Sequence, residues 1–150
     1  MVKIDSFRDN YAFLSNFYSV PVIYDGIQYQ NTESAFQAQK CANKEDRLQF
    51  SQLNPSEAKH LGRSITLRKD WESIKVSVMK DIVREKFLQN LDLLDRLLET
   101  GDCYLEEGND WCDRTWGTVN GVGRNLLGYT LMELRDEFAA ERDEIEDIGR

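Results

Sequence analysis

The stretch N-T-E-S-A-F-Q-A-Q-K, residues 31–40, carries residue types that could do acid–base chemistry. Read as a helix, it places Glu33 in the first turn, with Gln37 and Lys40 on the same side. A carboxylate in a first helical turn is also favoured by the helix dipole alone, so a solvated helix edge is the alternative. Glu33 is therefore a candidate whose role depends on what surrounds it.

A second polar segment, W-G-T-V-N-G-V-G-R-N-L-L-G over residues 116–128, contains four glycines and runs into a helix start. Glycines let backbone N–H groups approach a ligand, and a helix N-terminus favours anions, which together predict phosphate binding. The spacing matches neither G-x-G-x-x-G nor a P-loop. A plain loop that ends at a helix is the alternative.

Basic and aromatic residues also stand outside the apolar stripes. Arg63, Arg68 and Lys69 form either a surface charge run or an anion site. Trp71 begins a predicted helix, where it either covers the core or forms a wall of a site. Trp111 and Trp116 bracket Asp113, so this cluster is either a structural aromatic knot or a pair of stacking faces beside a carboxylate, as a planar base would need.

Metal and thiol chemistry have little support. Cys41, Cys103 and Cys112 do not have metal-ligand spacing, and His60 is the only histidine, which favours free thiols and a structural or surface histidine. A catalytic triad would lack its partners. We expect no bound metal and no cofactor.

Composition places the chain among soluble globular proteins with one domain, residues 1–150. It shows neither an apolar run long enough for a membrane span nor an N-terminal signal, so we expect a cytoplasmic protein without membrane contact. The net charge of −8 argues against a large nucleic-acid footprint but allows a local basic pocket. The acidic tail from about residue 141 is expected to be solvated or frayed.

Local signals predict an α+β fold that is mainly helical, with helices packed around a small sheet. Residues 11–30 read as strands, including a hairpin that turns at Asp25-Gly26. Helices are expected from residue 31 or 32 to about 42 or 43, from Asn54-Pro55-Ser56-Glu57 to Gly62, and from 71 to about 89. A further helix ends at Gly101, a short strand covers 103–107, and a last helix turns Leu127, Leu131, Leu134 and Phe138 inward.

Several ordered blocks resemble the NADAR family, also called the YbiA-like family. They are F-L-S-N-F-Y (13–18), T-E-S-A-F-Q-A-Q-K (32–40), G-R (62–63), L-R-K-D-W-E (67–72), V-M-K (78–80), Asp113-x-x-Trp116-Gly117, and G-x-N-x-L-G-x-x-L-M-x-x-R from Gly123 to Arg135. Together the blocks cover roughly residues 7–138. One block would be weak, but the ordered series is specific.

The resemblance implies an N-glycosidase or a binder of ribosylated compounds, with ADP-ribose on guanine in nucleic acid and ribosylated riboflavin-pathway intermediates as the known substrate types. It implies Glu33 and Asp113 as the carboxylates that act at the ribose, in roles the sequence does not order. The implied substrate-binding residues are Asn16, Phe17, Lys40, Arg63, Arg68, Trp71, Trp116, Gly117 and Asn125. Among them Lys40, Arg63 and Arg68 would hold phosphate, Asn16 and Asn125 would bond ribose hydroxyls or the base, and Trp71 would stack on the base or wall the ribose.

One segment departs from the family pattern. Between Cys103 and Trp116 the chain looks longer than in the bacterial riboflavin-linked members, which leaves open the substrate and the choice of Asp113 over Asp110. We favour an ADP-ribosylated base or another ADP-ribose conjugate as substrate, with local contact to modified nucleic acid. The alternatives are a riboflavin-pathway intermediate and a binding module that does not cut its ligand.

Overall fold

The computed structural model describes residues 2–149, which divide into two compact units. Unit 1 takes its described residues from the chain up to Leu14 and from Leu91 onward. Unit 2 is Ser15–Asn90. The candidate residues from Asn16 to Trp71 belong to unit 2, whereas Asp113 to Asn125 belong to unit 1.

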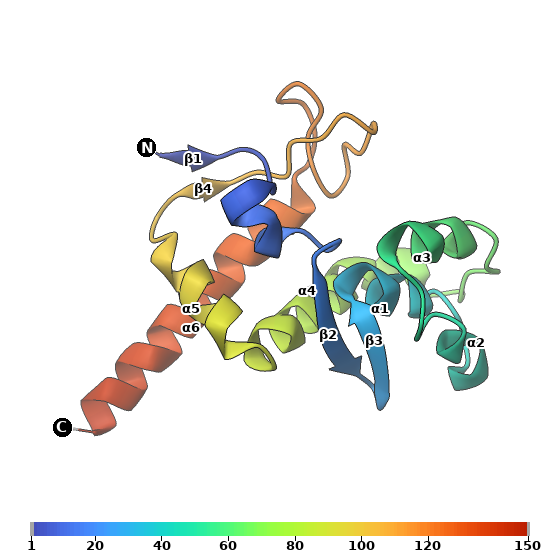
Figure 1. Cartoon of the computed structure of the whole chain (residues 1–150), viewed down its shortest axis with the longest axis horizontal. Helices are drawn as coiled ribbons and strands as arrows, with labels where there is room; N and C mark the ends of the chain where they lie inside the picture. Colours follow the sequence, from blue (N-terminus) through green and yellow to red (C-terminus); the bar gives the residue numbers. More distant parts are fainter. Residues whose placement is uncertain (1, 150) are drawn as a thin grey trace. The chain divides into compact units, whose positions relative to one another are not determined.

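Unit 2 begins with a hairpin of β2 (Ser19–Tyr24) and β3 (Ile27–Asn31), drawn in Figure 1. Asp25 and Gly26 have φ of 49° and 81°, the two positive values that a type I′ turn requires, so the predicted turn is confirmed. The inward side chains Val22, Ile27 and Tyr29 are buried.

The next element, α1 (Thr32–Ala38), is buried along its whole length. The Asn31 side chain caps it by accepting a hydrogen bond from the Ser34 amide at 2.7 Å. The helix ends at Ala38 rather than at residue 42 or 43, which corrects the predicted boundary. The amides of residues 39–41 instead bond three residues back in a tight turn, and the Lys40 carbonyl accepts from the Arg68 amide at 3.0 Å.

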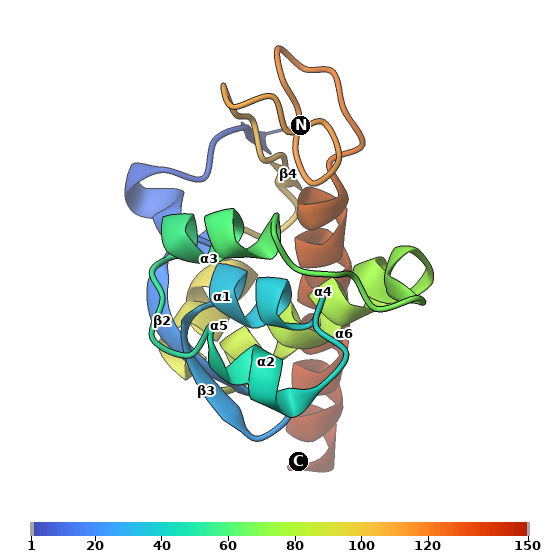
Figure 2. The ribbon, with the colours of Figure 1, turned by 90° about the vertical axis from the view of Figure 1, so that its right-hand side faces the viewer.

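Three more helices complete unit 2: α2 (Lys44–Leu48), α3 (Pro55–Gly62) and α4 (Trp71–Leu88). The α3 capping box predicted from Asn54 and Glu57 is confirmed, with both reciprocal hydrogen bonds present. Figure 2 shows α1 enclosed by its neighbours, and α1 packs against α3, α4 and both hairpin strands. Whatever α1 carries is therefore held from several sides.

Unit 1 contains β1 (Lys3–Ile4), a 3-10 helix (Asp9–Leu14), α5 (Leu91–Glu99), β4 (Tyr104–Leu105) and α6 (Leu126–Ile148). Strand β1 pairs in parallel with β4, with Lys3 opposite Tyr104. Within residues 2–149 the strands thus form two two-stranded sheets rather than one small sheet. The strand prediction for residues 11–14 was wrong, because those residues lie in the 3-10 helix.

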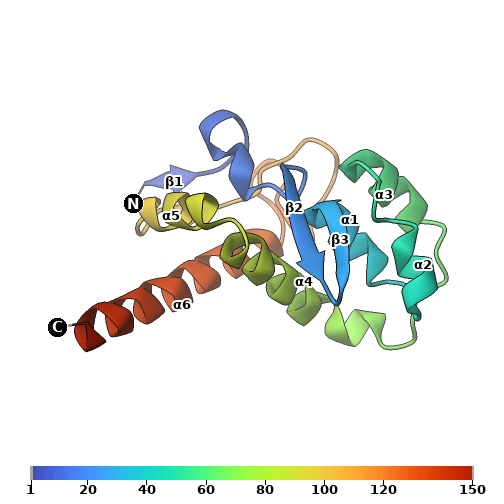
Figure 3. The ribbon, with the colours of Figure 1, turned by 60° about the horizontal axis from the view of Figure 1, so that its bottom comes forward.

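Helix α6 packs against α5 and β4 and is one continuous helix, as Figure 3 shows. Its predicted inward residues are confirmed as buried: Leu127, Leu131, Leu134 and Phe138. The acidic tail that we expected to be solvated or frayed is helical to Ile148, with exposed side chains. None of the helices in residues 2–149 has the length and apolar character that a membrane span requires.

Candidate active site

Glu33 lies in the first turn of α1, and only 8% of its surface is exposed. Its amide donates to the Asn16 carbonyl at 3.1 Å, which fixes the start of α1 against the S-N-F segment. Its Oε1 accepts a hydrogen bond from Gln37 Nε2, one helical turn later, at 2.9 Å. Glu33 is therefore a buried and oriented carboxylate and not a solvated helix edge.

The S-N-F segment faces α4. Asn16 is buried, and its Nδ2 lies 3.4 Å from the sulfur of Met79. Its Oδ1 is also buried and has no hydrogen-bond partner within residues 2–149. A buried acceptor without a donor costs free energy unless a ligand or water supplies one. Phe17, by contrast, is 44% exposed, and the Lys59 ammonium lies 5.9 Å from its ring centre.

Lys86 also holds this segment, by donating from Nζ to the Ser15 carbonyl at 3.0 Å. Only 1% of Lys86 is exposed, and burial lowers its pKa to about 7. Sequence reasoning missed Lys86, because a lysine in an amphipathic helix is normally assigned to the solvent face. The available signal was its spacing, four residues after Ile82 and three after Val83, which puts it on the buried face of α4.

A group of cations surrounds Lys40, in the turn after α1. Burial lowers the pKa of Lys40, the nearby Arg63 and Lys59 lower it further, and Glu33 and Glu72 act in the opposite direction. Within residues 2–149, none of Lys40, Lys59 and Arg63 has a carboxylate within 4.0 Å. We call these three residues the cation cluster; its member Lys59, on α3, was not among the predicted residues.

Arg68 and Trp71 have other immediate partners. Arg68 forms two hydrogen bonds with the Asp70 carboxylate, at 2.6 and 3.2 Å, so its charge is neutralised locally. It lines a hollow of about 460 Å³ with Arg47 and other residues, among which Glu33 does not occur. Trp71 is 4% exposed, and its ring centre lies 5.1 Å from that of Phe36 on α1. This burial argues against an open stacking face and agrees with the core-cover alternative, and the predicted wall of the site stays a prediction.

In unit 1, Asp113 organises its own loop. Its Oδ1 accepts from the amides of Thr115 and Trp116 at 3.0 and 2.9 Å. The alternative, Asp110, has an exposed carboxylate 3.9 Å from the Arg8 guanidinium. Asp113 is thus the better ordered of the two aspartates, and its catalytic role stays a prediction.

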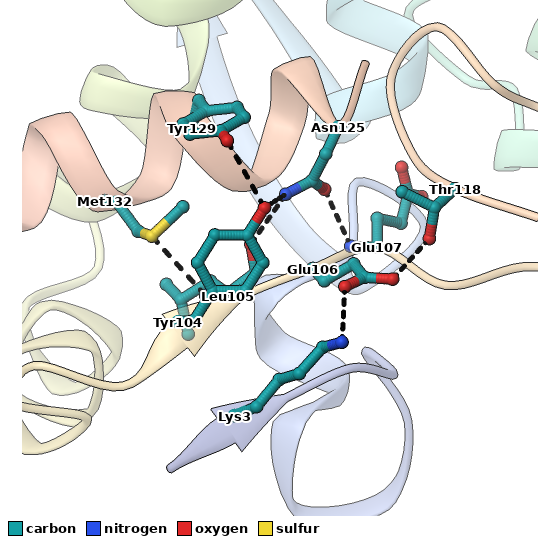
Figure 4. Close-up of polar contacts among 9 residues, drawn as sticks. All are labelled: Lys3, Tyr104, Leu105, Glu106, Glu107, Thr118, Asn125, Tyr129 and Met132. Atoms are coloured by element: carbon teal, nitrogen blue, oxygen red, sulfur yellow. Dashed lines mark hydrogen bonds and ion pairs between the residues drawn. The ribbon is translucent and has the colours of Figure 1, made fainter. Parts of the chain in front are cut away.

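Asn125 joins the start of α6 to β4, as Figure 4 shows. It is 1% exposed and has a left-handed backbone with φ of 51°. Its Oδ1 accepts from the Glu107 amide at 3.0 Å, while its Nδ2 donates to the Leu105 carbonyl at 2.9 Å and lies 3.4 Å from the Tyr104 hydroxyl. Both the oxygen and the nitrogen of the Asn125 side chain are hydrogen-bonded within the chain, so this residue has a structural role. Its predicted contact with a ligand stays a prediction.

The first two amides of α6 and the two amides before them are already bonded within the chain. The amides of residues 124–127 donate to the carbonyls of Arg114, Gly117, Thr115 and Trp116, respectively. A side chain at Gly117 would overlap the Glu107 carbonyl and come within 2.8 Å of Asn109 Nδ2. The predicted phosphate site at this helix start is therefore not supported, because the chain itself satisfies those donors.

A second polar cluster ties the same region to β1 (Figure 4). The buried Glu106 accepts from the Thr118 hydroxyl at 2.6 Å and pairs with Lys3 at 3.0 Å. The Thr118 hydrogen bond, with the help of Lys3, holds the pKa of Glu106 below its usual range despite burial. Sequence reasoning missed this cluster because its members are far apart in the chain.

No group of three or more His, Cys, Asp or Glu side chains within residues 2–149 has a geometry that could hold a metal ion. Cys41, Cys103 and Cys112 are free thiols, as predicted.

Comparison with known proteins places this arrangement in a family. The NADAR domain matches residues 5–139. A protein named N-glycosidase YbiA from Shigella boydii is 39% identical over 95% of this chain and 91% of its own length. A riboflavin biosynthesis protein from Vibrio vulnificus is 42% identical over 87% of this chain, but only 36% of its own length is covered.

A solved structure agrees. The NMR structure of the Escherichia coli protein YbiA matches with a TM-score of 0.84 and 39% identity, covering 95% of this chain and 87% of that one. The predicted α+β fold and the family resemblance are both confirmed. The chain belongs to the NADAR family.

Proposed function

We propose that this protein is an N-glycosidase that hydrolyses, without a metal ion, the bond between a ribose and a base nitrogen in a phosphate-bearing substrate. The observation that carries the proposal is Glu33, a buried and oriented carboxylate whose charge acts on Lys40 of the cation cluster. The relatives named N-glycosidase, which match over nearly their full length, support the reaction type.

The chemistry follows from charge. As the bond from ribose C1′ to nitrogen breaks, its electron pair leaves with the base and positive charge builds on the ribose ring. A carboxylate beside C1′ stabilises that charge, or takes a proton from the water whose oxygen bonds to C1′. The base nitrogen gains a proton. Glu33 is our choice for this carboxylate, and Asp113 remains the proposed second one.

The cation cluster supports a substrate with phosphate. Three positive side chains that lack carboxylate partners repel one another, and a bound phosphate would relieve that repulsion. We favour ADP-ribose attached to guanine or a related conjugate. With a net charge of −8, contact with a modified nucleic acid should be short and local.

A second substrate class has its own support. The 42% identical relative from Vibrio vulnificus is named a riboflavin biosynthesis protein, which favours a ribosylated riboflavin-pathway intermediate. The same carboxylate and cations would serve that substrate, because it has the same ribose–nitrogen bond and a phosphate. A module that binds without cutting would not need Glu33 at the bond.

The test is incubation of the protein with a panel of ADP-ribosylated DNA, ADP-ribosylated protein, NAD, ADP-ribose and riboflavin-pathway ribosylamines, with products identified by mass spectrometry. We expect release of a free base and a ribose-phosphate product from one class. Glu33→Gln should lose this release. Glu45→Gln is the matched control, because Glu45 lies in the first turn of α2 but is exposed. If every panel compound stays intact, the proposal fails.

A further inference from the structure

We infer that Gln37 is a positioning residue for Glu33, and that Gly62 on α3 is the residue that makes room for it. The inference rests on the proposed function, because it takes Glu33 as the catalytic carboxylate. The two side chains lie one turn apart on α1, and Gln37 Nε2 donates to Glu33 Oε1 at 2.9 Å. Both residues are buried, so water does not readily replace this bond.

The Gln37 amide has one workable orientation. Its Nε2 faces the carboxylate, while its Oε1 is buried and has no hydrogen-bond partner within the described part of the chain. A flipped amide would set its oxygen against the Glu33 oxygen, and two acceptors repel. The protein thus tolerates an unpaired carbonyl oxygen in order to direct a donor at Glu33. Such a buried unpaired atom calls for an explanation, and orientation of Glu33 supplies one.

Gly62 allows this arrangement because it lacks a side chain. A Cβ at this position would overlap Gln37 Oε1 and lie 2.8 Å from its Cδ and 3.4 Å from its Cγ. Real Cβ atoms do not approach that closely, so the amide would have to move. The Gln37 amide therefore packs against the backbone of Gly62 at the end of α3, and α3 packs directly on α1.

The same turn of α3 carries two members of the cation cluster. Lys59 precedes Gly62 by three residues and Arg63 follows it. The end of α3 thereby positions both the Gln37 amide and the cations that would hold phosphate. The charged groups that act on Lys40, in the turn after α1, include Glu33 from α1, Lys59 from α3, Arg63 just after α3, and Glu72 from α4.

A donor aimed at a carboxylate has two effects on the reaction. It holds the side chain in one rotamer, and it favours the charged form of the carboxylate, the form that stabilises a positive ribose. Loss of the donor should therefore lower turnover and move the acidic limb of the pH–rate profile to higher pH. A residue that only filled space would not move that limb.

The experiment is a double-mutant cycle with Gln37→Met, Gly62→Ala and both together, on the substrate that the panel identifies. We expect kcat to fall about 10- to 100-fold in Gln37→Met, as for a misplaced catalytic group, with KM little changed and the acidic limb moved to higher pH. Gly62→Ala should do the same. The double variant should be no worse than either single one, because both changes remove the same hydrogen bond from Gln37 to Glu33.

Gln49→Met is the matched control, since Gln49 is exposed after α2 and its side chain donates to the Asp46 carbonyl in its own turn. If Gly62→Ala does not fold, Gln37→Met alone carries the test. A wild-type kcat and pH profile in Gln37→Met would overturn the inference. A wild-type profile in Gln37→Met together with an inactive Glu33→Gln would remove only the role of Gln37. If Glu33→Gln is fully active, the Glu33 assignment in the proposed function fails instead.

Discussion

The region around α1 and the loop before α6 both carry blocks of the family pattern, but they differ in how their polar groups are bonded. Around α1, the cation cluster lacks carboxylate partners, and Asn16 and Gln37 each keep a buried unpaired oxygen within residues 2–149. In the loop before α6, Asp113, Asn125 and the first helix amides are bonded to the chain itself. The first region has polar groups left for a ligand, whereas in the second Asp113, Asn125 and these amides hold the shape of the loop.

The difference has a thermodynamic meaning. Unpaired polar atoms and uncompensated charges destabilise a folded protein, so they persist mainly where function requires them. Satisfied polar atoms in a glycine-bearing loop need no function to explain them. We therefore expect substitutions near α1 to change ligand binding and catalysis, and substitutions in the loop to change stability.

The largest stability effect should come from Asn125→Ala. It removes a buried amide that joins β4 to α6, so the free energy of unfolding should fall by about 3 kcal/mol. Asn120→Ala is the control, because Asn120 is exposed and also has a left-handed backbone, with φ of 52°. Urea unfolding measures both. A loss no larger than that of Asn120→Ala would mean that the loop is not held by this amide.

Lys86 should make stability depend on pH. Its folded pKa of about 7 lies below its unfolded value of 10.5, so between these pH values the unfolded chain binds the extra proton. Stability from this residue therefore rises with pH over that range, by up to about 1.4 kcal/mol per unit.

The measurement is the unfolding free energy at pH 7, 8 and 9 for the wild type and Lys86→Met. The unfolding free energy of the wild type should rise more with pH than that of Lys86→Met. Equal slopes would show that folding does not lower the pKa of Lys86.

The cation cluster should affect ligand affinity. Arg63→Gln and Lys59→Gln should each weaken ADP-ribose binding by roughly tenfold, the effect of losing one charge-assisted contact. Unfolding free energy should stay the same or rise, because repulsion within the cluster falls. Calorimetry measures the affinity, with Arg142→Gln on the exposed end of α6 as the control. Unchanged affinity in both variants would remove the phosphate role.

The smallest stability effect is expected from Asp113→Asn. The amide oxygen can still accept from Thr115 and Trp116, so the unfolding free energy should change by no more than about 0.5 kcal/mol. If Asp113 is also the second catalytic carboxylate, turnover should fall by at least ~100-fold, as for a positioned acid or base. A variant with normal stability and normal turnover would leave Asp113 as a loop residue only.

Much of the fold was readable because its signals are local. The Asp25-Gly26 turn, the Asn54 capping box and the helix from Trp71 each depend on a few neighbouring residues. The pairing of β1 with β4 was not readable, because it joins two-residue strands about one hundred residues apart. The early end of α1 depends on a contact with Arg68 that no local pattern contains.

The site was readable only in part, for a related reason. The pattern selected Glu33, Lys40 and Arg63 as candidates, but it also selected Asn125, whose amide is used inside the fold. Residue type and spacing say which groups can do chemistry. Whether a polar group is available to a ligand or already bonded depends on its tertiary surroundings. Lys86 bonds the Ser15 carbonyl, and Gly62 leaves room for the Gln37 amide.

The most direct test of the account is the single-turnover rate of Glu33→Gln at saturating substrate, measured beside ligand affinity. The variant keeps the size of the side chain and loses its charge. We expect affinity to stay close to wild type while the rate falls by at least ~100-fold, with Glu45→Gln unaffected. A wild-type rate in Glu33→Gln would contradict it.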